Sequence, residues 1–295
     1  MQRYMLELST GYANFCDAVV APSESVGEIL RERGVTRPIH VVPTGVELEL
    51  FAAGDDAAMR RRLQLPPDAP VVGHVGRLAP EKNLTFLAEA AAKALQKVHS
   101  GRFLVVGSGP SETDIRHAFR AAGVADRLHF AGVCTGSDLA DAYHAMDVFA
   151  FASKSETQGM VLVEALAAGT PVVAVDAPGA REVVRDGENG RLLDQADVES
   201  FAAALAEMMT ADKDEAEKLR RRAKQSARPF HRDRSCDAMV GVYEQVRDSQ
   251  PLAIDPQTSS WPGAMRSIKR EWDLWTNRVR SAATALTSEN HVRGS

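Results

Sequence analysis

A chain of 295 residues holds one large domain or two small ones, and 25% charged and 44% hydrophobic residues are ordinary for a globular protein. A formal net charge of −5 argues against a general nucleic-acid binder. Three widely spaced cysteines (Cys16, Cys134, Cys236) lack metal-ligand spacing and predict reduced thiols in a cytoplasmic protein, and no apolar run approaches the ~20 residues that span a bilayer.

Residues 1–45 predict the remnant of an N-terminal domain. A helix-like segment leads into an apolar run at residues 17–21, and Ser23 is a candidate N-cap for a helix that reaches Arg33. A second short strand is expected at residues 40–43. Two strands and a few helices bury too little apolar surface to form a core of their own. Residues 46–70 follow as a linker and a first helix.

Residues 71–230 alternate short β-rich runs with longer helical patterns. This alternation predicts an α/β fold, a Rossmann-like parallel sheet with helices on both faces. The expected strands are residues 71–75, 103–106, 128–130, 148–152, 171–175 and 190–193. The expected helices, identified by apolar residues three or four positions apart, are residues 83–98, 112–122, 137–144, 160–168 and 198–209.

The C-terminal part of the chain has a different composition. Residues 231–247 predict a crossover helix, and residues 248–295 predict a proline-punctuated linker with an amphipathic helix at 265–286. All three tryptophans lie in or beside that helix, among basic residues. The helix either docks its apolar stripe on protein or lies on a membrane surface, where tryptophan and basic side chains suit the headgroup region.

Two short basic runs also lie inside predicted helices, Arg60-Arg61-Arg62 and Arg220-Arg221-Arg222. Such runs are typical of a solvated helix face, and we expect these arginines to point into solvent.

The segment from Glu156 to Glu164 is the most informative part of the sequence. It places two carboxylates on either side of a glycine turn, between an apolar strand and a helix. Glu156 is expected on the strand-to-helix loop, and Glu164 about one turn into the helix. Open α/β sheets bind ligands at the carboxyl ends of their strands, so both carboxylates are predicted at a ligand-binding edge.

A second polar motif follows the strand at residues 71–75. Arg77 offers a fork of donors that suits phosphate oxygens, and Lys82 adds a point charge just before the next helix. The unpaired N–H groups and the dipole of a helix start also favour an anion. Together these features predict an anion site at the same edge as Glu156 and Glu164.

Glycine-rich loops follow the neighbouring strands and let the backbone approach a ligand closely. Gly107 and Gly109 lie in such a loop and form a partial match to a dinucleotide fingerprint. Because Glu112 occupies the position of the third glycine, an NAD site is disfavoured.

These motifs together resemble the C-terminal, nucleotide-sugar-binding half of a retaining glycosyltransferase of family 4, which has the GT-B fold of two facing Rossmann-like domains. The resemblance covers roughly residues 10–245. Its matching stretches are Gly76-Arg77 with Glu81-Lys82-Asn83, residues 105–110, residues 130–132, residues 155–159 and residues 164–173.

The resemblance implies a role for each candidate residue. Arg77 and Lys82 would hold the donor diphosphate and stabilise its charge as the sugar leaves. Glu156 would contact hydroxyls of the donor sugar, and Glu164 would accept hydrogen bonds from the ribose. Arg77, Lys82 and Glu156 are the expected catalytic residues. The other expected donor-binding residues are Gly76, Gly107, Gly109, Val133 near the base, Gly159, Met160 and Val161. The cations replace a metal ion, and no cofactor is implied.

The resemblance also implies transfer of a hexose from a UDP- or GDP-sugar, with retention through front-face attack. Gln158 stands where many relatives carry an aromatic residue, and residues 177–182 depart from the usual glycine-rich pattern. Both departures are similar to bacterial glycolipid-forming members. A lipid acceptor at the inner face of the cell membrane is therefore the leading expectation, with a saccharide as the other.

The acceptor site and a functional histidine belong to an N-terminal domain in this family, and the resemblance begins near the end of that domain. We therefore expect the 295 residues alone to bind a nucleotide sugar weakly and to need the missing domain or a partner chain. Two alternatives stay open: a sugar-nucleotide epimerase of the same fold, and a non-catalytic fragment that binds nucleotide sugar.

Overall fold

The computed structural model describes residues 2–154, 156–249 and 276. The chain divides into two compact units, Pro43–Ser235 and the combination of Met1–Val42 with Cys236–Ser295. Apart from Thr276, the predicted amphipathic helix at 265–286 lies outside the described residues, as does most of the predicted tail at 248–295.

The unit Pro43–Ser235 contains a six-stranded sheet in the order β5-β4-β3-β6-β7-β8, in which every neighbouring pair is parallel. This confirms the predicted α/β fold, and the strand boundaries agree with the expected ones to within two residues. The strands are β3 (Val71–Val75), β4 (Arg102–Val106), β5 (Leu128–Gly132), β6 (Val148–Phe151), β7 (Val172–Val175) and β8 (Gly190–Leu193).

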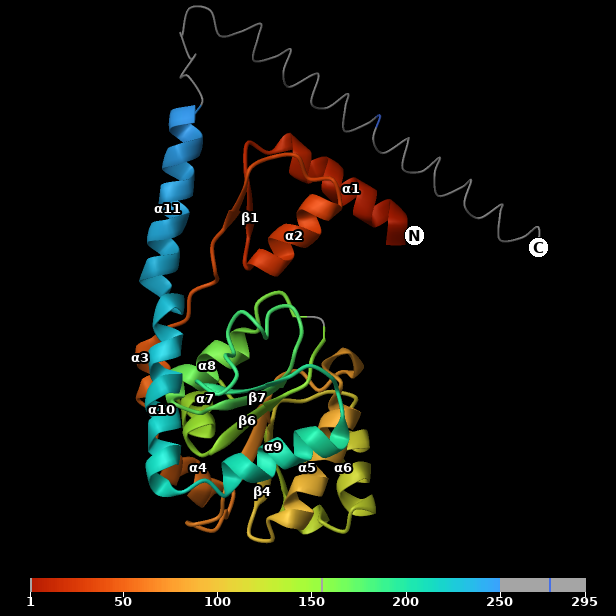
Figure 1. Cartoon of the computed structure of the whole chain (residues 1–295), viewed down its shortest axis with the longest axis vertical. Helices are drawn as coiled ribbons and strands as arrows, with labels where there is room; N and C mark the ends of the chain where they lie inside the picture. The colour runs from red at the N-terminus through yellow and green to blue at the C-terminus, as the bar shows by residue number, and fades with distance from the viewer. Residues whose placement is uncertain (1, 155, 250–275, 277–295) are drawn as a thin grey trace, which may run out of the picture. The chain divides into compact units, whose positions relative to one another are not determined.

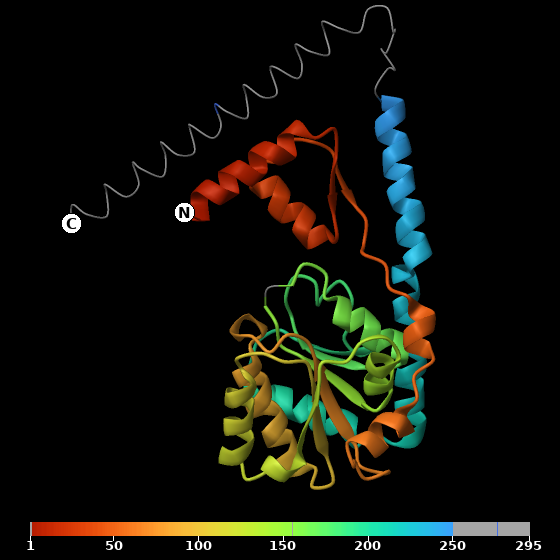
Figure 2. The ribbon, with the colours of Figure 1, turned by 180° about the vertical axis from the view of Figure 1, so that it is seen from behind.

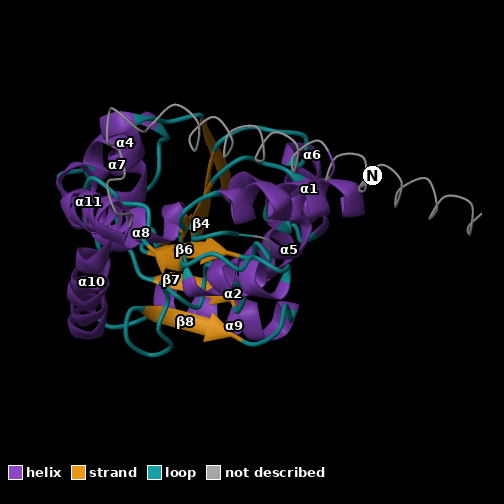
Figure 3. Ribbon diagram, turned by 90° about the horizontal axis from the view of Figure 1, so that it is seen from above, coloured by secondary structure: helices purple, strands orange, loops and turns teal. Residues whose placement is uncertain are grey.

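Helices cover both faces of this sheet (Figures 1 and 3). One face carries α5 (Leu84–Lys97), α6 (Glu112–Ala121) and α9 (Val198–Met209). The other carries α3 (Leu48–Ala52), α4 (Asp56–Arg62), α7 (Gly136–His144), α8 (Met160–Ala168) and α10 (Lys213–Ala227). Three short 3-10 helices complete the unit: η1 (Pro80–Lys82), η2 (Ala125–Arg127) and η3 (Arg228–Phe230).

The alternation of side chains along each strand explains why both faces are covered. In β6, Phe149 and Phe151 pack on the α7–α8 side, whereas Val148 and Ala150 pack on the α5–α9 side. All four are buried. Strands that are apolar on both faces must lie between two helical layers, as parallel sheets do.

Helix boundaries in this unit follow from capping residues. Asp197 accepts a hydrogen bond from Ser200 N at 2.7 Å and begins α9, and Asp212 accepts one from Glu215 N at 2.9 Å and begins α10. Gly169 ends α8 in the left-handed conformation, with a φ of +87°.

Asp147, just before β6, joins three elements. Its carboxylate lies 2.7 Å from Arg220 Nη2 on α10 and 3.4 Å from Arg60 Nη2 on α4, and it accepts a hydrogen bond from Val71 N at 2.9 Å. The expectation that both basic runs are solvated is therefore wrong for Arg60 and Arg220, because a partly buried carboxylate draws them inward. Arg61 is exposed, as expected.

The other unit contains α1 (Gln2–Phe15), β1 (Val19–Ala21), α2 (Glu24–Glu32) and β2 (Ile39–Val41) (Figure 2). From Cys236 onward it also contains α11 (Arg232–Ser249). The strands are parallel, with Val19 opposite Ile39. The predicted N-cap of α2 is confirmed, since Ser23 Oγ accepts from Val26 N at 3.3 Å. No helix within the described residues is long and apolar enough to cross a membrane.

Candidate functional site

The sheet has one point where the chain changes direction, between β3 and β6. The helix after β3, α5, packs on one face, whereas the helix after β6, α8, packs on the other. The loops after these two strands therefore diverge at the carboxyl edge. Ligands of open α/β sheets bind at such switch points.

Lys82 and Glu156 meet at this switch point. Lys82 ends η1 in the loop after β3, Glu156 lies in the loop after β6, and Lys82 Nζ forms an ion pair with Glu156 Oε1. Their side chains are 22% and 18% exposed, so the pair is partly desolvated but reachable. Asn83 follows in the left-handed conformation and donates to Ala152 O at 3.4 Å, which ties the two loops together.

Arg77 lies in the same loop as Lys82 but is held differently. Its side chain is 71% exposed and donates to Glu81, one turn further along. Exposed pairs of this kind contribute roughly 0–1 kcal/mol, so a ligand phosphate can displace Glu81 from Arg77 with little loss of stability.

The glycines at the ends of β3 and β4 allow their loops to stack directly on each other. A Cβ on Gly107, which has a φ of +130°, would lie 1.9 Å from Gly76 O. A Cβ on Gly109 would lie 2.4 Å from Leu78 O, and Leu78 N donates to Ser108 O at 3.0 Å. Only glycine fits at these positions, and the loops after β3 and β4 therefore meet backbone to backbone.

The second carboxylate, Glu164, is anchored on α8. Its Oε2 accepts a hydrogen bond from Tyr143 Oη at 2.8 Å. Burial raises the pKa of the Glu164 carboxyl, and the hydrogen bond from Tyr143 opposes that rise. Burial also raises the pKa of Tyr143 well above its ordinary value, which keeps the phenol protonated as the donor. Nothing in the sequence pattern distinguishes Tyr143 from a core aromatic, and sequence reasoning missed it.

The start of α8 carries the remaining donors of this edge. Gly159 is the N-cap, with a φ of +68°, and Met160 and Val161 are the first two helical residues. Their backbone N–H groups have no acceptor within the helix and point out of its first turn. The loop after β7 lies close by, since a Cβ on Gly179 would be 3.1 Å from Gln158 N and 3.1 Å from Glu156 Cβ.

Gln158, the residue that departs from the family pattern, joins the site to the segment before α3. Its side-chain amide donates to Thr44 O at 2.9 Å, and its carbonyl oxygen accepts from Thr44 N at 2.6 Å. Gln158 is buried. An aromatic side chain could not make this pair of hydrogen bonds, so the departure fixes the position of Thr44 against the loop after β6.

His74 lies beneath the site, in the middle of β3, and is 3% exposed. Its Nδ1 donates to Ala150 O at 3.1 Å, whereas its Nε2 is buried with no hydrogen-bond partner among the described residues. The pKa of His74 is lowered to about 4, mainly by burial and also by the nearby charge of Lys82, while the hydrogen bond to Ala150 O and the charge of Glu156 oppose this change. The ring is therefore neutral at physiological pH.

Val133 is a predicted site residue that lies away from the Lys82–Glu156 pair. It is exposed just beyond β5, at the edge of the sheet, with β4 and β3 between β5 and β6. Two strand spacings of ~4.8 Å separate β5 from β3, which precedes Lys82, and three separate it from β6, which precedes Glu156, so Val133 lies roughly 10–14 Å from the pair.

Two relatives illustrate what the chain is similar to. A D-inositol 3-phosphate glycosyltransferase of Acidothermus cellulolyticus is 37% identical over 235 residues, which cover 76% of this chain and 52% of the relative. A GDP-mannose-dependent alpha-mannosyltransferase of Mycobacterium tuberculosis is 34% identical over 231 residues, covering 78% and 57%. The chain thus spans about half the length of the curated relatives it matches.

Solved structures match over a similar part. A sucrose-phosphate synthase from Thermosynechococcus elongatus gives a TM-score of 0.70 at 27% identity, covering 83% of this chain and 62% of that one. HepE of Anabaena, solved in complex with UDP and glucose, gives a TM-score of 0.73 at 24% identity, covering 84% and 68%. The second likeness shows the fold alone.

Family models cover most of the described chain. The one for glycosyl transferases group 1 matches residues 55–228, which span the sheet and the Lys82–Glu156 switch point, and the one for glycosyltransferase family 4 matches residues 1–50. The chain therefore belongs to the glycosyl transferases group 1 family, and it is of the family 4 type with the GT-B fold.

Proposed function

We propose that this chain provides the donor site of an enzyme that transfers a hexose from a nucleoside-diphosphate sugar, with retention of anomeric configuration. The observation that carries the proposal is the Lys82–Glu156 ion pair at the switch point of the sheet. It sets a cation and a sugar-binding carboxylate side by side where this fold binds ligands.

The two cations suit the diphosphate. As the bond from the anomeric carbon to the phosphate oxygen breaks, negative charge grows on the leaving nucleotide, and fixed cations lower the energy of that transition state. The Lys82 ammonium has three donors, so it can keep Glu156 and still donate to a phosphate oxygen. Arg77 is free to swing from Glu81 to the other phosphate. This charge, with the first turn of α8, takes the place of a metal ion in the proposal.

The rest of the site suits the sugar and the nucleoside. Glu156, held by Lys82, accepts hydrogen bonds from hydroxyls of the donor sugar. Glu164 uses Oε2 for Tyr143, which leaves Oε1 for the ribose hydroxyls. The N–H groups at the start of α8 meet the sugar and phosphate, and Val133 lies near the base at the far end of an extended nucleotide sugar.

Neither carboxylate is placed as a hydrolase acid or base. Glu156 is paired with Lys82, and Glu164 is hydrogen-bonded to a tyrosine on α7, so each already has a binding role. In the proposed mechanism the departing phosphate accepts the acceptor's proton as the new bond forms on the same face of the sugar. Retention would appear as an NMR-observed anomeric configuration identical in donor and product.

The proposal also concerns which nucleotide base the donor carries and which acceptor receives the sugar. The relatives are named for GDP-mannose and for D-inositol 3-phosphate, whereas the sequence departures at Gln158 and at residues 177–182 point to a lipid acceptor at the inner membrane face. We propose that the acceptor is bound with the help of an N-terminal domain or a partner chain. Parallel assays with inositol 3-phosphate and diacylglycerol separate the two acceptor classes.

Calorimetric titration of the 295-residue chain with UDP, GDP and their sugar conjugates tests the donor site. Lys82→Ala and Arg77→Ala should each weaken diphosphate binding roughly 10- to 100-fold, because each removes a charge-assisted hydrogen bond. Lys97→Ala, at the exposed far end of α5, is the matched control and should bind as the wild type does. Equal affinity in Lys82→Ala and Lys97→Ala would sink the assignment.

A turnover assay separates the alternative functions. Release of an epimerised free nucleotide sugar would favour the epimerase, which shares the fold. Tight nucleotide binding without any transfer, even when an N-terminal domain is supplied in trans, would favour a binding fragment. We expect the chain alone to turn over poorly and the supplemented chain to transfer hexose.

A further inference from the structure

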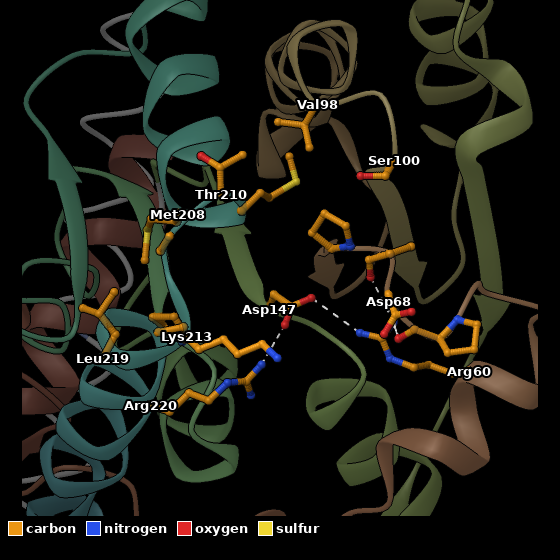
Figure 4. Close-up of a pocket in the computed structure, with 17 residues that line it drawn as sticks. Arg60, Asp68, Val98, Ser100, Asp147, Met208, Thr210, Lys213, Leu219 and Arg220 are labelled. Carbon is orange, nitrogen blue, oxygen red and sulfur yellow. Dashed lines mark hydrogen bonds and ion pairs between the residues drawn. The ribbon is translucent and has the colours of Figure 1, made fainter.

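A cavity lies at the opposite edge of the sheet from the Lys82–Glu156 pair. It has a volume of about 470 Å³ and is lined by residues just before the strands, among them Pro70 before β3, Asp147 before β6 and Pro171 before β7 (Figure 4). A cavity of this size accommodates a small organic molecule. The donor site occupies the carboxyl edge of the same strands, so the two sites are separate.

One face of α10 supplies the charges of this cavity. Lys213, Ala216 and Arg220 are spaced three and four residues apart and line the same wall. Figure 4 shows the side chains of Lys213 and Arg220 pointing toward Asp147. Three cationic side chains line the cavity (Arg60, Lys213, Arg220) against two carboxylates (Asp68, Asp147).

These cations differ in how far they are already satisfied. Arg60 donates to four backbone carbonyl oxygens as well as to Asp147. Arg220 makes one hydrogen bond to the described part of the chain, from Nη2 to Asp147 Oδ1 at 2.7 Å. The side chain of Lys213 makes neither a hydrogen bond nor an ion pair with any residue that the structure describes. Arg60 is therefore structural, whereas Lys213 and Arg220 have donors left for a ligand.

The remaining lining is largely apolar. Met208 and Met209 at the end of α9, Leu219 on α10 and Val98 after α5 form walls beside the two cations. Methionine side chains adapt their shape to an apolar body more readily than branched ones do. The cavity thus combines an anion-binding corner with an apolar, deformable wall.

We propose that this cavity is a binding site for a small organic anion, separate from the donor site. The anionic group, a phosphate or a carboxylate, binds to Lys213 and to the open side of the Arg220 guanidinium. The apolar body packs against Met208, Met209 and Leu219. Asp147 keeps Arg220 oriented, since it holds Nη2 and leaves the other nitrogens of the fork to face the cavity.

The test uses the full chain carrying Arg77→Ala and Lys82→Ala, so that the donor site does not compete for phosphate. Phenyl phosphate and benzoate are titrated by calorimetry, with benzyl alcohol as the neutral probe. Saturable binding of at least one anion is expected, weakened about fivefold or more by Lys213→Ala and further by Lys213→Glu, because each removes a favourable charge. Phenyl phosphate binding more tightly than benzoate would identify a phosphate ligand, and the reverse a carboxylate.

Lys218→Ala is the matched control, because Lys218 lies on α10 but outside the cavity and pairs with Glu215 at 3.7 Å. It should bind the anions as the host does. Equal affinity in Lys213→Ala and Lys218→Ala, equal affinity for benzyl alcohol and the anions, or no saturable binding would each overturn the proposal. None of these outcomes bears on the donor site, so the two proposals fail independently.

Discussion

The two edges of the sheet use the same residue types for different purposes. At the edge formed by the amino ends of the strands, called the amino edge below, Arg60 is 13% exposed and is fixed by four carbonyl oxygens and by Asp147. At the carboxyl edge, Arg77 is 71% exposed and is held by one glutamate in its own loop. An arginine that several acceptors hold, as Arg60 is held, stabilises the fold, whereas one with a single exposed partner, as Arg77 has, can release that partner and meet another group.

The backbone shows the same division. The carboxyl edge stacks loops so closely that Gly107 admits no side chain, whereas a Cβ on Gly123, which follows α6, would have nothing within 4 Å of it. Close backbone packing therefore fixes the loops after β3 and β4 against each other at the carboxyl edge.

The largest expected effect comes from adding one methyl group at Gly107, where two loops of the carboxyl edge meet. Gly107→Ala should destabilise the chain by about 3–5 kcal/mol, because the new Cβ overlaps Gly76 O and alanine disfavours a φ of +130°. Nucleotide binding should fall with it. Gly123→Ala, also at positive φ but in open space, should cost only about 1 kcal/mol and keep binding. Urea unfolding and calorimetry measure both, and equal losses in the two variants would break the comparison.

The next largest effect concerns the amino edge. Asp147→Ala should destabilise the chain by about 2–3 kcal/mol, because it leaves Arg60, Arg220 and Val71 N without their shared acceptor, and partial exposure reduces the cost below that of a fully buried pair. Affinity for a nucleoside diphosphate should not change while the chain is folded.

Asp138→Ala is the control for Asp147→Ala, because Asp138 also pairs with an arginine, Arg62 at 3.0 Å, but is exposed. Its loss should cost less than about 1 kcal/mol. If Asp147→Ala weakened nucleotide binding as much as Lys82→Ala does, the two edges would not be separable.

The sequence predicts the sheet well because strands such as β6 and β7 are apolar on both faces and helices such as α5 have a clear apolar period. It also brings Lys82 and Glu156 to one edge, since parallel strands align their carboxyl ends. It does not predict Asp147 as a joint between α4 and α10, because the arginines that meet there are 160 positions apart, at 60 and 220. The hydrogen bonds of Tyr143 with Glu164 and of Gln158 with Thr44 were not predicted for the same reason: the partners are distant in sequence, and no local pattern marks such contacts.

His74 gives a pH-dependent test of the core beneath the site. Its pKa falls from the ordinary 6.5 to about 4 on folding, so the unfolded chain binds the extra proton first as the pH drops. His74 should therefore contribute stability above pH 6.5 that is lost as the pH falls toward 4, about 2 kcal/mol by pH 5.

Two variants without a titrating ring, His74→Phe and His74→Gln, check this expectation. Both should lose less stability than the wild type between pH 7 and pH 5, whatever their stability at pH 7. Glutamine keeps a donor for Ala150 O, and phenylalanine keeps the ring that stacks on Phe149. Parallel stability–pH curves for all three chains, measured by urea unfolding, would show that His74 does not titrate as described.

The smallest effect concerns Gln158, a residue of the carboxyl edge that we expect to stabilise the fold. Gln158→Ala should destabilise the chain by about 1–2 kcal/mol, because it leaves Thr44 N and Thr44 O without their partners. Gln158→Glu should cost more, since it sets a carboxylate oxygen against Thr44 O. Gln96→Ala, which loses one exposed hydrogen bond to Ala122 O, should stay within about 0.5 kcal/mol of the wild type. Faster amide exchange at Thr44 in Gln158→Ala, with unchanged exchange in α5, would locate the loss. If Thr44 exchanged at the wild-type rate, Gln158 would not fix this segment, and its two hydrogen bonds would not account for the stability of the carboxyl edge.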